Sequence, residues 1–219
     1  MMSQASLVQP PRVAAWLVDL FTPGEQTESI LGDLLEEFSD LATKSGVAYA
    51  RRWYWRQSVK TIAHLTGTEF RVAPWSIIGT VLGGYLLLAF GTSWPEQAIV
   101  GVLHFRRHHV TPYYANLDAY VFWLNTSILI GRLLMSLFIG CIVAAVAKGK
   151  EMVAVMTLGL VWAAMAGVGI LLLVTRHWPE QAFFLPFLVD QFGSSGMIVM
   201  GGVIVRESRS AMSRRPSGA

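Results

Sequence analysis

Charged residues are scarce in this chain of 219 residues, and cysteine is almost absent. Asp, Glu, Lys and Arg make up 14% of the sequence, whereas a water-soluble domain carries about a quarter. The single cysteine, Cys141, has no partner in the chain, which excludes a disulfide framework. The first residues lack a basic stretch leading into an apolar run, so we expect no cleaved signal peptide.

Motifs that mark common enzymes are also missing. The sequence contains no phosphate-binding loop of the G-x-x-x-x-G-K-[ST] type, no nucleophile elbow and no H-E-x-x-H. Acidic residues, which many catalytic sites require, are sparse after residue 73. We therefore predict a protein without enzyme activity and without a cofactor.

What the chain does contain is apolar sequence, 53% of all residues, and it is unevenly distributed. Residues 1–73 have a composition typical of soluble proteins, whereas residues 74–208 form apolar blocks of roughly 20 residues, the length that crosses a bilayer. The sequence predicts an all-α protein in which a small cytoplasmic helical domain (1–73) precedes a four-helix transmembrane bundle (74–208). Residues 209–219 are expected to form a disordered basic tail.

Four apolar segments are predicted to span the membrane. They are Trp75–Ser93, a stretch within Ala119–Ala147, Met152–Val174, and about Pro186–Val205. Each is expected to be helical because backbone polar groups have no water to bond in lipid. Lys and Arg are more frequent in the N-terminal domain, in the turn AKGKE and in the tail than in the other loops. That bias predicts a bacterial inner-membrane protein with both termini in the cytoplasm.

The string WPEQA occurs twice, at Trp94–Ala98 and at Trp178–Ala182. Each copy follows an apolar segment, so Trp94 and Trp178 are predicted to anchor helices at the outer interface, where tryptophan is enriched. A long outer loop is expected over residues 94–118. One interpretation is an internal repeat of two helix–WPEQA–helix hairpins in parallel orientation; the alternative is two similar membrane exits that favour similar residues.

Small residues recur at spacings that let helices approach closely in lipid. These are Gly79 and Gly83 in the first segment, Ala163 and Gly167 in the third, and Gly193, Gly196, Gly201 and Gly202 in the fourth. The pattern favours a compact bundle over four separate anchors.

Two charged residues, Arg132 and Asp190, fall inside apolar segments. When the two halves of the membrane domain are aligned, both residues lie at similar depth, and we predict that they pair because an isolated charge there is costly. Asn125, Thr126 and Gln191 are candidates to complete a polar cluster. Three interpretations remain open: an ion or substrate site, a structural pair, or an arginine that reaches the outer headgroups.

Three histidines, His104, His108 and His109, lie in the predicted outer loop. Helical spacing would bring the first two to one face. No cysteine or carboxylate accompanies them, and Arg106 and Arg107 would repel a cation. Since zinc sites use three or four ligands, we predict no metal site.

The N-terminal domain is expected to contain three helices. The first covers Pro11–Phe21; Thr22 caps a second that runs to about Lys44; and Gly46 breaks it before a third begins near Val47. The apolar face of the second helix consists of Ile30, Leu31, Leu34, Leu35, Phe38 and Leu41.

A basic and aromatic run in the third helix is predicted to dock on a partner protein or on lipid headgroups. It consists of Arg51, Arg52, Trp53, Trp55 and Arg56. A competing interpretation places these cations on the acidic face of the second helix. The pI of about 9.2 does not indicate nucleic-acid binding, because the acidic residues leave this domain without net positive charge.

The first 65 residues or so resemble the N-terminal prefix domain of bacterial FtsX/MacB-type ABC-transporter permeases. The segments that carry the resemblance are Pro10–Arg12, Ile30–Phe38 and Ala50–Gln57. The remainder departs from that family, because no large domain separates the first two membrane segments. The resemblance implies an association with membrane transport or its regulation.

Two functions follow as hypotheses. The first is a non-enzymatic adaptor or accessory component of a transport system that docks partners through its cytoplasmic domain. The second is a small oligomeric transporter or channel with Arg132 and Asp190 lining the path. Expected partners are the lipid bilayer, a protein of a transport complex and a second copy of the chain.

Overall fold

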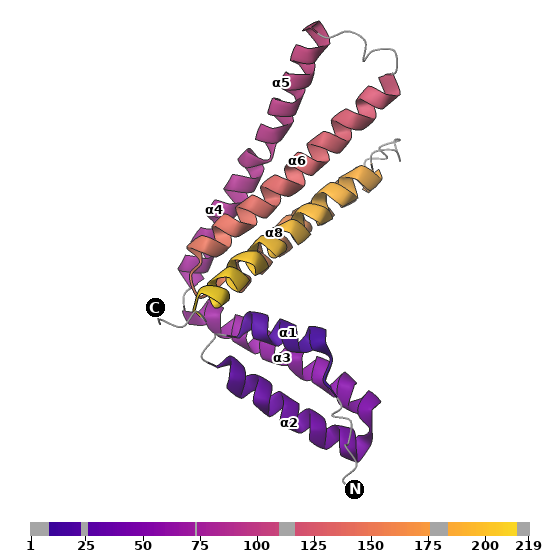
Figure 1. Ribbon diagram of the computed structural model, residues 1–219. Helices are drawn as coiled ribbons and strands as arrows, with labels where there is room; N and C mark the ends of the chain where they lie inside the picture. The colour runs from indigo at the N-terminus through magenta and orange to yellow at the C-terminus, as the bar shows by residue number, and fades with distance from the viewer. Residues whose placement is uncertain (1–8, 23–25, 73, 110–116, 176–183, 214–219) are drawn as a thin grey trace, which may run out of the picture. The chain divides into compact units, whose positions relative to one another are not determined.

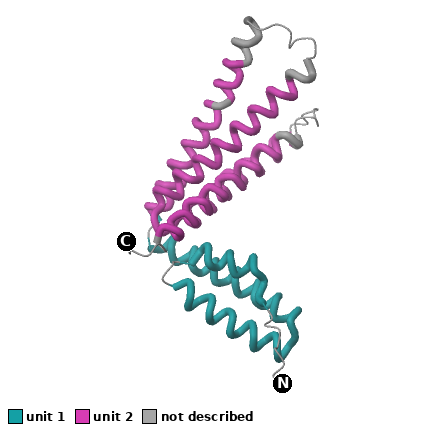
Figure 2. The backbone as a smooth tube through the Cα atoms, in the orientation of Figure 1, with its two compact units in different colours: residues 1–74 teal, residues 75–219 magenta. Residues whose placement is uncertain are grey.

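In the computed structural model, residues 9–22, 26–72, 74–109, 117–175 and 184–213 are described. These residues form helices α1 to α8 and no strand (Figure 1). The predicted all-α class is therefore confirmed for the described part of the chain. The chain divides into two compact units, residues 1–74 and 75–219 (Figure 2).

Unit 1 contains α1 (Arg12–Phe21), α2 (Thr27–Ser45) and α3 (Val47–Val72). Its core takes two residues from each helix, four positions apart, so that each helix turns one face inward. These buried residues are Ala14, Val18, Leu34, Phe38, Ala50 and Tyr54. The rings of Phe38 and Tyr54 meet edge to face, with centroids 5.7 Å apart. Leu35, assigned to the apolar face from the sequence, is 48% exposed.

Of the two connections within unit 1, the one between α2 and α3 is as predicted and the one between α1 and α2 is not. Gly46 has φ 85°, a conformation that L side chains rarely adopt, and it separates α2 from α3 as expected. The sequence predicted that Thr22 caps α2, but α2 begins after Gln26. The Thr22 hydroxyl donates to the carbonyl of Val18, 2.7 Å away, and so terminates α1. Residues 23–25 lie outside the described ones.

Unit 2 contains α4 (Pro74–Gly91), α5 (Ser93–His109), α6 (Leu117–Val146), α7 (Glu151–Thr175) and α8 (Phe184–Ser213). Four helical stretches are long and apolar enough to cross a membrane: Pro74–Val102, Val121–Val146, Glu151–Leu172 and Phe187–Met212. The predicted number of spans is thus confirmed for the described residues, and it indicates a membrane protein.

Two predicted non-helical regions are helical instead. The expected outer loop over 94–118 is helical as far as His109, because α5 starts directly after α4. Pro95 does not prevent this, since proline is tolerated in a first helical turn, where no backbone donor is lost. Residues 209–213, predicted to belong to the disordered tail, are helical, because α8 continues to Ser213. Residues 214–219 lie outside the described ones.

Helices α6 and α8 run parallel to each other. Arg132 meets Asp190 and Gly140 meets Ile198, both 58 positions apart, and Cys141 Sγ lies 3.6 Å from the carbonyl oxygen of Gly201, 60 positions later. A side chain on Gly140 would overlap the Ile198 carbonyl, and one on Gly201 would come within 2.5 Å of the Leu137 carbonyl. The two backbones are therefore in direct contact.

Of the predicted small-residue contacts in α8, those of Gly193, Gly201 and Gly202 are confirmed, whereas Gly196 has no neighbouring atom within 4 Å of an added side chain. Gly201 packs on α6, and Gly202 packs on Val155 of α7. By contrast, Gly79, Gly83 and Gly167 have no neighbouring atom within 4 Å of an added side chain. In α4 the close contact is made instead by Gly84, which meets Val143 and Leu158, both on other helices.

Candidate functional site

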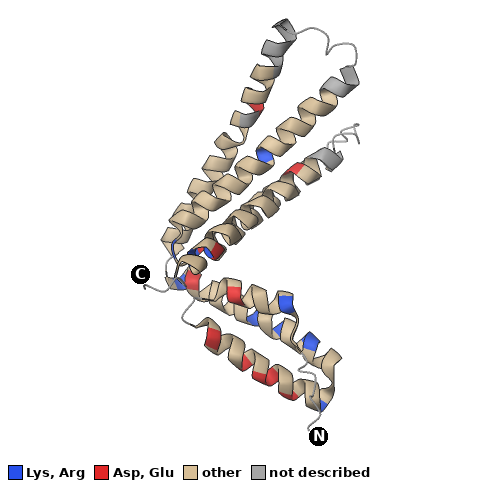
Figure 3. Ribbon diagram, in the orientation of Figure 1, with Lys and Arg blue, Asp and Glu red and all other residues tan. Residues whose placement is uncertain are grey.

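Charged residues are concentrated in unit 1 and at the end of unit 2 where α6 meets α7 (Figure 3). Three charged residues of the candidate spans, Glu96, Arg132 and Asp190, contact one another, and we call them the triad. They come from α5, α6 and α8 respectively. The other charged residues of these spans are Glu151, Arg206, Glu207 and Arg209.

Arg132 joins the two acidic residues through different nitrogens. Its Nη1 donates to Asp190 Oδ2 at 2.8 Å, and its Nη2 donates to Glu96 Oε2 at 2.6 Å. The structure therefore brings together the two residues that the sequence paired and adds a third. Because charge-assisted hydrogen bonds of this kind are about twice as strong as neutral ones, Arg132 fixes three helices at one level.

Sequence reasoning missed Glu96 although it lies in the first WPEQA string. The string was expected to mark an exit from the membrane, which would have placed Glu96 outside the bundle. Because α5 starts directly after α4 at Ser93, Glu96 instead reaches the level of Arg132. Trp94 lies two residues earlier and is 75% exposed. Its role as an interface anchor stays a prediction, and Trp178 lies outside the described residues.

Hydrogen bonds within the triad leave two of its polar atoms without a partner. The side chains of Arg132, Glu96 and Asp190 are 34%, 42% and 13% exposed. Arg132 Nε and Asp190 Oδ1 are buried without a hydrogen-bond partner. With all three residues ionised, the triad has a net charge of one negative unit, which is unfavourable in apolar surroundings.

The other residues expected in the polar cluster do not join it. Asn125 is exposed, whereas Thr126 and Gln191 are half-buried. In the described part of the chain, none of the three hydrogen-bonds to the triad.

Two serines accompany the triad instead. Ser136 follows Arg132 by four residues and Ser194 follows Asp190 by four, so each lies on the same helix face as the charged residue before it. Both serines are buried. Ser136 Oγ has no hydrogen-bond partner. The four-residue spacing between each serine and the charged residue before it was the sequence signal that could have identified them.

The triad lies well away from the end of the bundle at which α6 meets α7. Arg132 precedes the last residue of α6, Val146, by fourteen positions, which corresponds to about 21 Å along a helix. In a hydrocarbon layer of about 30 Å, the triad falls within the apolar region.

A second ionic contact holds that end of the bundle. Arg209 of α8 donates to Glu151 Oε1 and, at 2.8 Å, to the carbonyl of Ala145. The same oxygen of Glu151 accepts the backbone N–H of Gly149 at 3.1 Å. Glu151 is nearly buried, with 7% of its side chain exposed. Arg209 therefore binds the turn between α6 and α7, and its role is structural.

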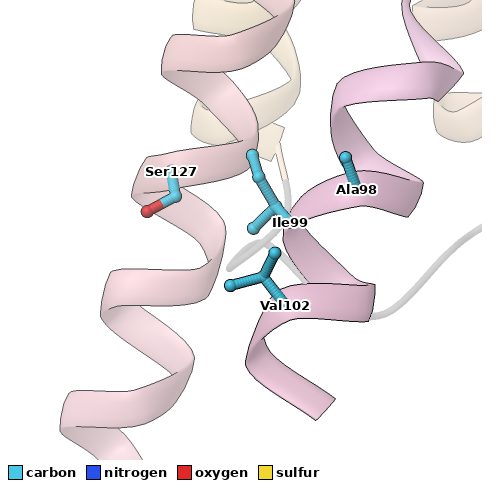
Figure 4. Close-up of a pocket in the computed structure, with 4 residues that line it drawn as sticks. All are labelled: Ala98, Ile99, Val102 and Ser127. Carbon is cyan, nitrogen blue, oxygen red and sulfur yellow. The ribbon is translucent and has the colours of Figure 1, made fainter. Parts of the chain in front are cut away.

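A cavity of about 310 Å³ lies between α5 and α6 (Figure 4). It is lined by Ala98, Ile99, Val102 and Ser127. Ile99 follows Glu96 by three residues, one helical turn, so the cavity lies beside the triad on α5. Among the described residues of its lining, the Ser127 hydroxyl is the one polar side-chain group, and none is charged.

In unit 1, the predicted docking residues divide between the core and the surface. Trp53 packs against the core. Arg51, Arg52, Trp55 and Arg56 are exposed, and the spacing of these four, which we call the basic patch, puts them on one face of α3. In the described part of unit 1, none of its arginines forms an ion pair with the acids of α2.

No group of three potential metal ligands occurs among the described side chains. The side chains of His104, His108 and His109 are outside that set, although the backbone of all three is in α5. No protein family, curated protein or solved structure matches this chain.

Proposed function

We propose that the chain is a non-enzymatic membrane protein that serves as an adaptor or accessory component of a transport system. In this proposal the three-helix unit lies in the bacterial cytoplasm and docks a protein of the transport complex. The observation that carries it is the basic patch: three arginines and a tryptophan share one exposed face of α3 and have no acidic partner within the described part of unit 1.

The chemistry of the patch is typical of a binding surface. Arginine and tryptophan are enriched at interaction hot spots, because both combine a large contact area with directed hydrogen bonding. The side chain of Trp55 is 39% exposed. Trp55 follows Arg51 and Arg52 by about one helical turn. The resemblance of this unit to transporter prefix domains supports a transport protein as the partner.

Co-purification from native membranes tests the docking role. In the patch variant, Arg51, Arg52, Trp55 and Arg56 are all changed to alanine, which leaves the core of unit 1 untouched. The control changes Asp33, Glu36 and Glu37 on α2 to alanine, since these are also exposed. A transporter subunit should be recovered with the wild type and the control and be lost with the patch variant. Recovery of the same transporter subunit with the patch variant contradicts the proposal.

A second candidate, a small transporter, is supported by the triad and the cavity beside it. Buried polar atoms without partners inside a membrane bundle are typical of ion and substrate paths. In this case purified protein in liposomes should produce a saturable flux of ions or small solutes. Arg132→Leu should abolish the flux, whereas Lys148→Leu, at an exposed position in the α6–α7 turn, should not. An unchanged background flux favours the adaptor.

A further inference from the structure

Unit 1 has two exposed surfaces of opposite charge, one on α2 and one on α3 (Figure 3). On α2, Asp33, Glu36 and Glu37 are exposed, and residues three and four positions apart share one face of a helix. We call these three residues the acidic surface. The positive charge is on α3, in the basic patch. In the described part of unit 1, no ion pair joins the acidic surface to the patch.

One copy of the chain cannot join these two surfaces, because both point away from the core of unit 1. Glu36 lies two residues before the core residue Phe38, and Arg52 lies two residues before the core residue Tyr54. Residues two positions apart on an α-helix differ in direction by about 200°. Glu36 and Arg52 are therefore on the outer sides of their helices. An ion-pair partner for either residue comes from outside unit 1.

The patch and its surroundings have the anatomy of a protein interface. Trp55 and Val59 are 39% and 59% exposed, and their four-residue spacing puts them on one face of α3. An arginine of the patch precedes each of them by three residues, so that charges border an apolar centre. On α2, Gly32 lies one turn before Glu36 and has no atom within 4 Å of an added side chain. The acidic surface therefore has room beside it for a large side chain from a partner.

We propose that two copies of this chain associate through unit 1, with the basic patch of one copy against the acidic surface of the other. Charge complementarity selects the second copy, because three arginines meet three carboxylates and each chain carries both surfaces. Copies with the same topology in one bilayer carry unit 1 on the same side. Anchoring also raises their effective concentration, so a contact made of exposed ion pairs, each of them weak, is sufficient. The proposal does not depend on docking of a transport protein, which would compete with the second copy for the patch.

Two differently tagged copies of the full-length chain, co-expressed and purified in a non-ionic detergent, test the proposal. Wild-type copies should recover one another at low salt, and less so at high salt, which screens exposed charges. A patch-reversal variant, with Arg51, Arg52 and Arg56 changed to glutamate, should recover its own second copy at least about tenfold less, because like charges then oppose each other. The control changes Arg12 and Arg71 to glutamate, at exposed positions of unit 1 outside the patch. It should behave as the wild type.

Charge exchange separates a lost contact from a lost fold. An acid-reversal variant, with Asp33, Glu36 and Glu37 changed to lysine, should also fail to recover its own second copy. The patch-reversal and acid-reversal variants should nevertheless recover each other, because the intact acidic surface of one meets the intact patch of the other. Full recovery of the patch-reversal variant by its own copy, or no recovery between the two variants, overturns the proposal. Wild-type recovery that requires added anionic phospholipid overturns it too, because the arginines then bind lipid headgroups.

Discussion

The two units of this protein differ in how they use their large apolar side chains. In unit 1 the most buried large residues, Phe38 and Tyr54, lie at the centre. In unit 2 many large residues face outward, including Leu82, Phe90 and Leu171. Three glycines of unit 2, Gly140, Gly201 and Gly202, lie where helices touch. In water, apolar side chains associate because their burial removes apolar surface from water. In lipid, helices associate through close packing and polar contacts. The composition of unit 1 suits the first case, and that of unit 2 suits the second.

The largest effect on stability is expected from removing a large side chain from the core of unit 1. Phe38→Ala should lower the free energy of unfolding of that unit by about 3–5 kcal/mol, the typical cost of removing a buried phenylalanine ring. Hydrogen exchange of the α2 and α3 amides measures it in the full-length protein. Leu35→Ala, at a half-exposed position of the same helix, is the control and should change exchange little. Equal effects of both would mean that unit 1 has no such core.

Adding a side chain where two backbones touch should have the next largest effect, in unit 2. In Gly201→Leu the new side chain meets the Leu137 carbonyl, and overpacking of this kind costs about 1–3 kcal/mol. Thermal unfolding in detergent should show a lower midpoint. Gly196→Leu on the same helix meets no neighbouring atom and should keep the wild-type midpoint. If the two variants behave alike, glycine contact does not hold α6 to α8.

A smaller loss is expected at the ionic contact of Glu151 and Arg209. Glu151→Gln keeps the size of the side chain but removes the charge opposite Arg209. We expect destabilisation by about 1 kcal/mol, since the arginine is partly exposed and the water around it screens the pair. The same thermal measurement applies, with the exposed Glu207→Gln of α8 as control. A loss no greater than that of the control would show that Arg209 does not bind the turn.

The smallest effect concerns the pH dependence of unit 1. Burial raises the pKa of Tyr54 above its usual value of 10.0. The unfolded chain therefore ionises first as the pH rises, so stability is intact below about pH 10 and falls as the pH increases toward the folded-state pKa. Exchange of the α3 amides should accelerate in this range in the wild type and much less in Tyr54→Phe. Identical alkaline profiles would exclude Tyr54 as the cause.

Much of this fold is predictable from the sequence because it depends on local periodicity and length. The helical stripe containing Leu34 and Phe38 locates the core face of α2, and apolar blocks long enough to cross a bilayer locate the four spans. The contact of Arg132 with Asp190 was also accessible, because both are rare charges at matching positions of similar segments. Duplication of the two halves stays a prediction.

Other features depend on information that no local pattern contains. Gly79 and Gly83 have the spacing of a contact motif but face open space, because the spacing does not say which side of a helix its neighbours cover. Glu96 could not be assigned because the string WPEQA is compatible with a chain that leaves the membrane and with one that continues as a helix. Thr22 could cap either of two helices.

The sequence alone determined the number of apolar spans and the division between a water-compatible unit and a lipid-compatible one, because hydrophobic periodicity and segment length act within each segment. The tertiary structure decided which residues meet: Glu96 with Arg132, Gly140 with the backbone of α8, and Gly202 with Val155 of α7. Such contacts depend on the rotation and register of one helix against another. Those are set by the packing of all the helices together, which no single segment encodes.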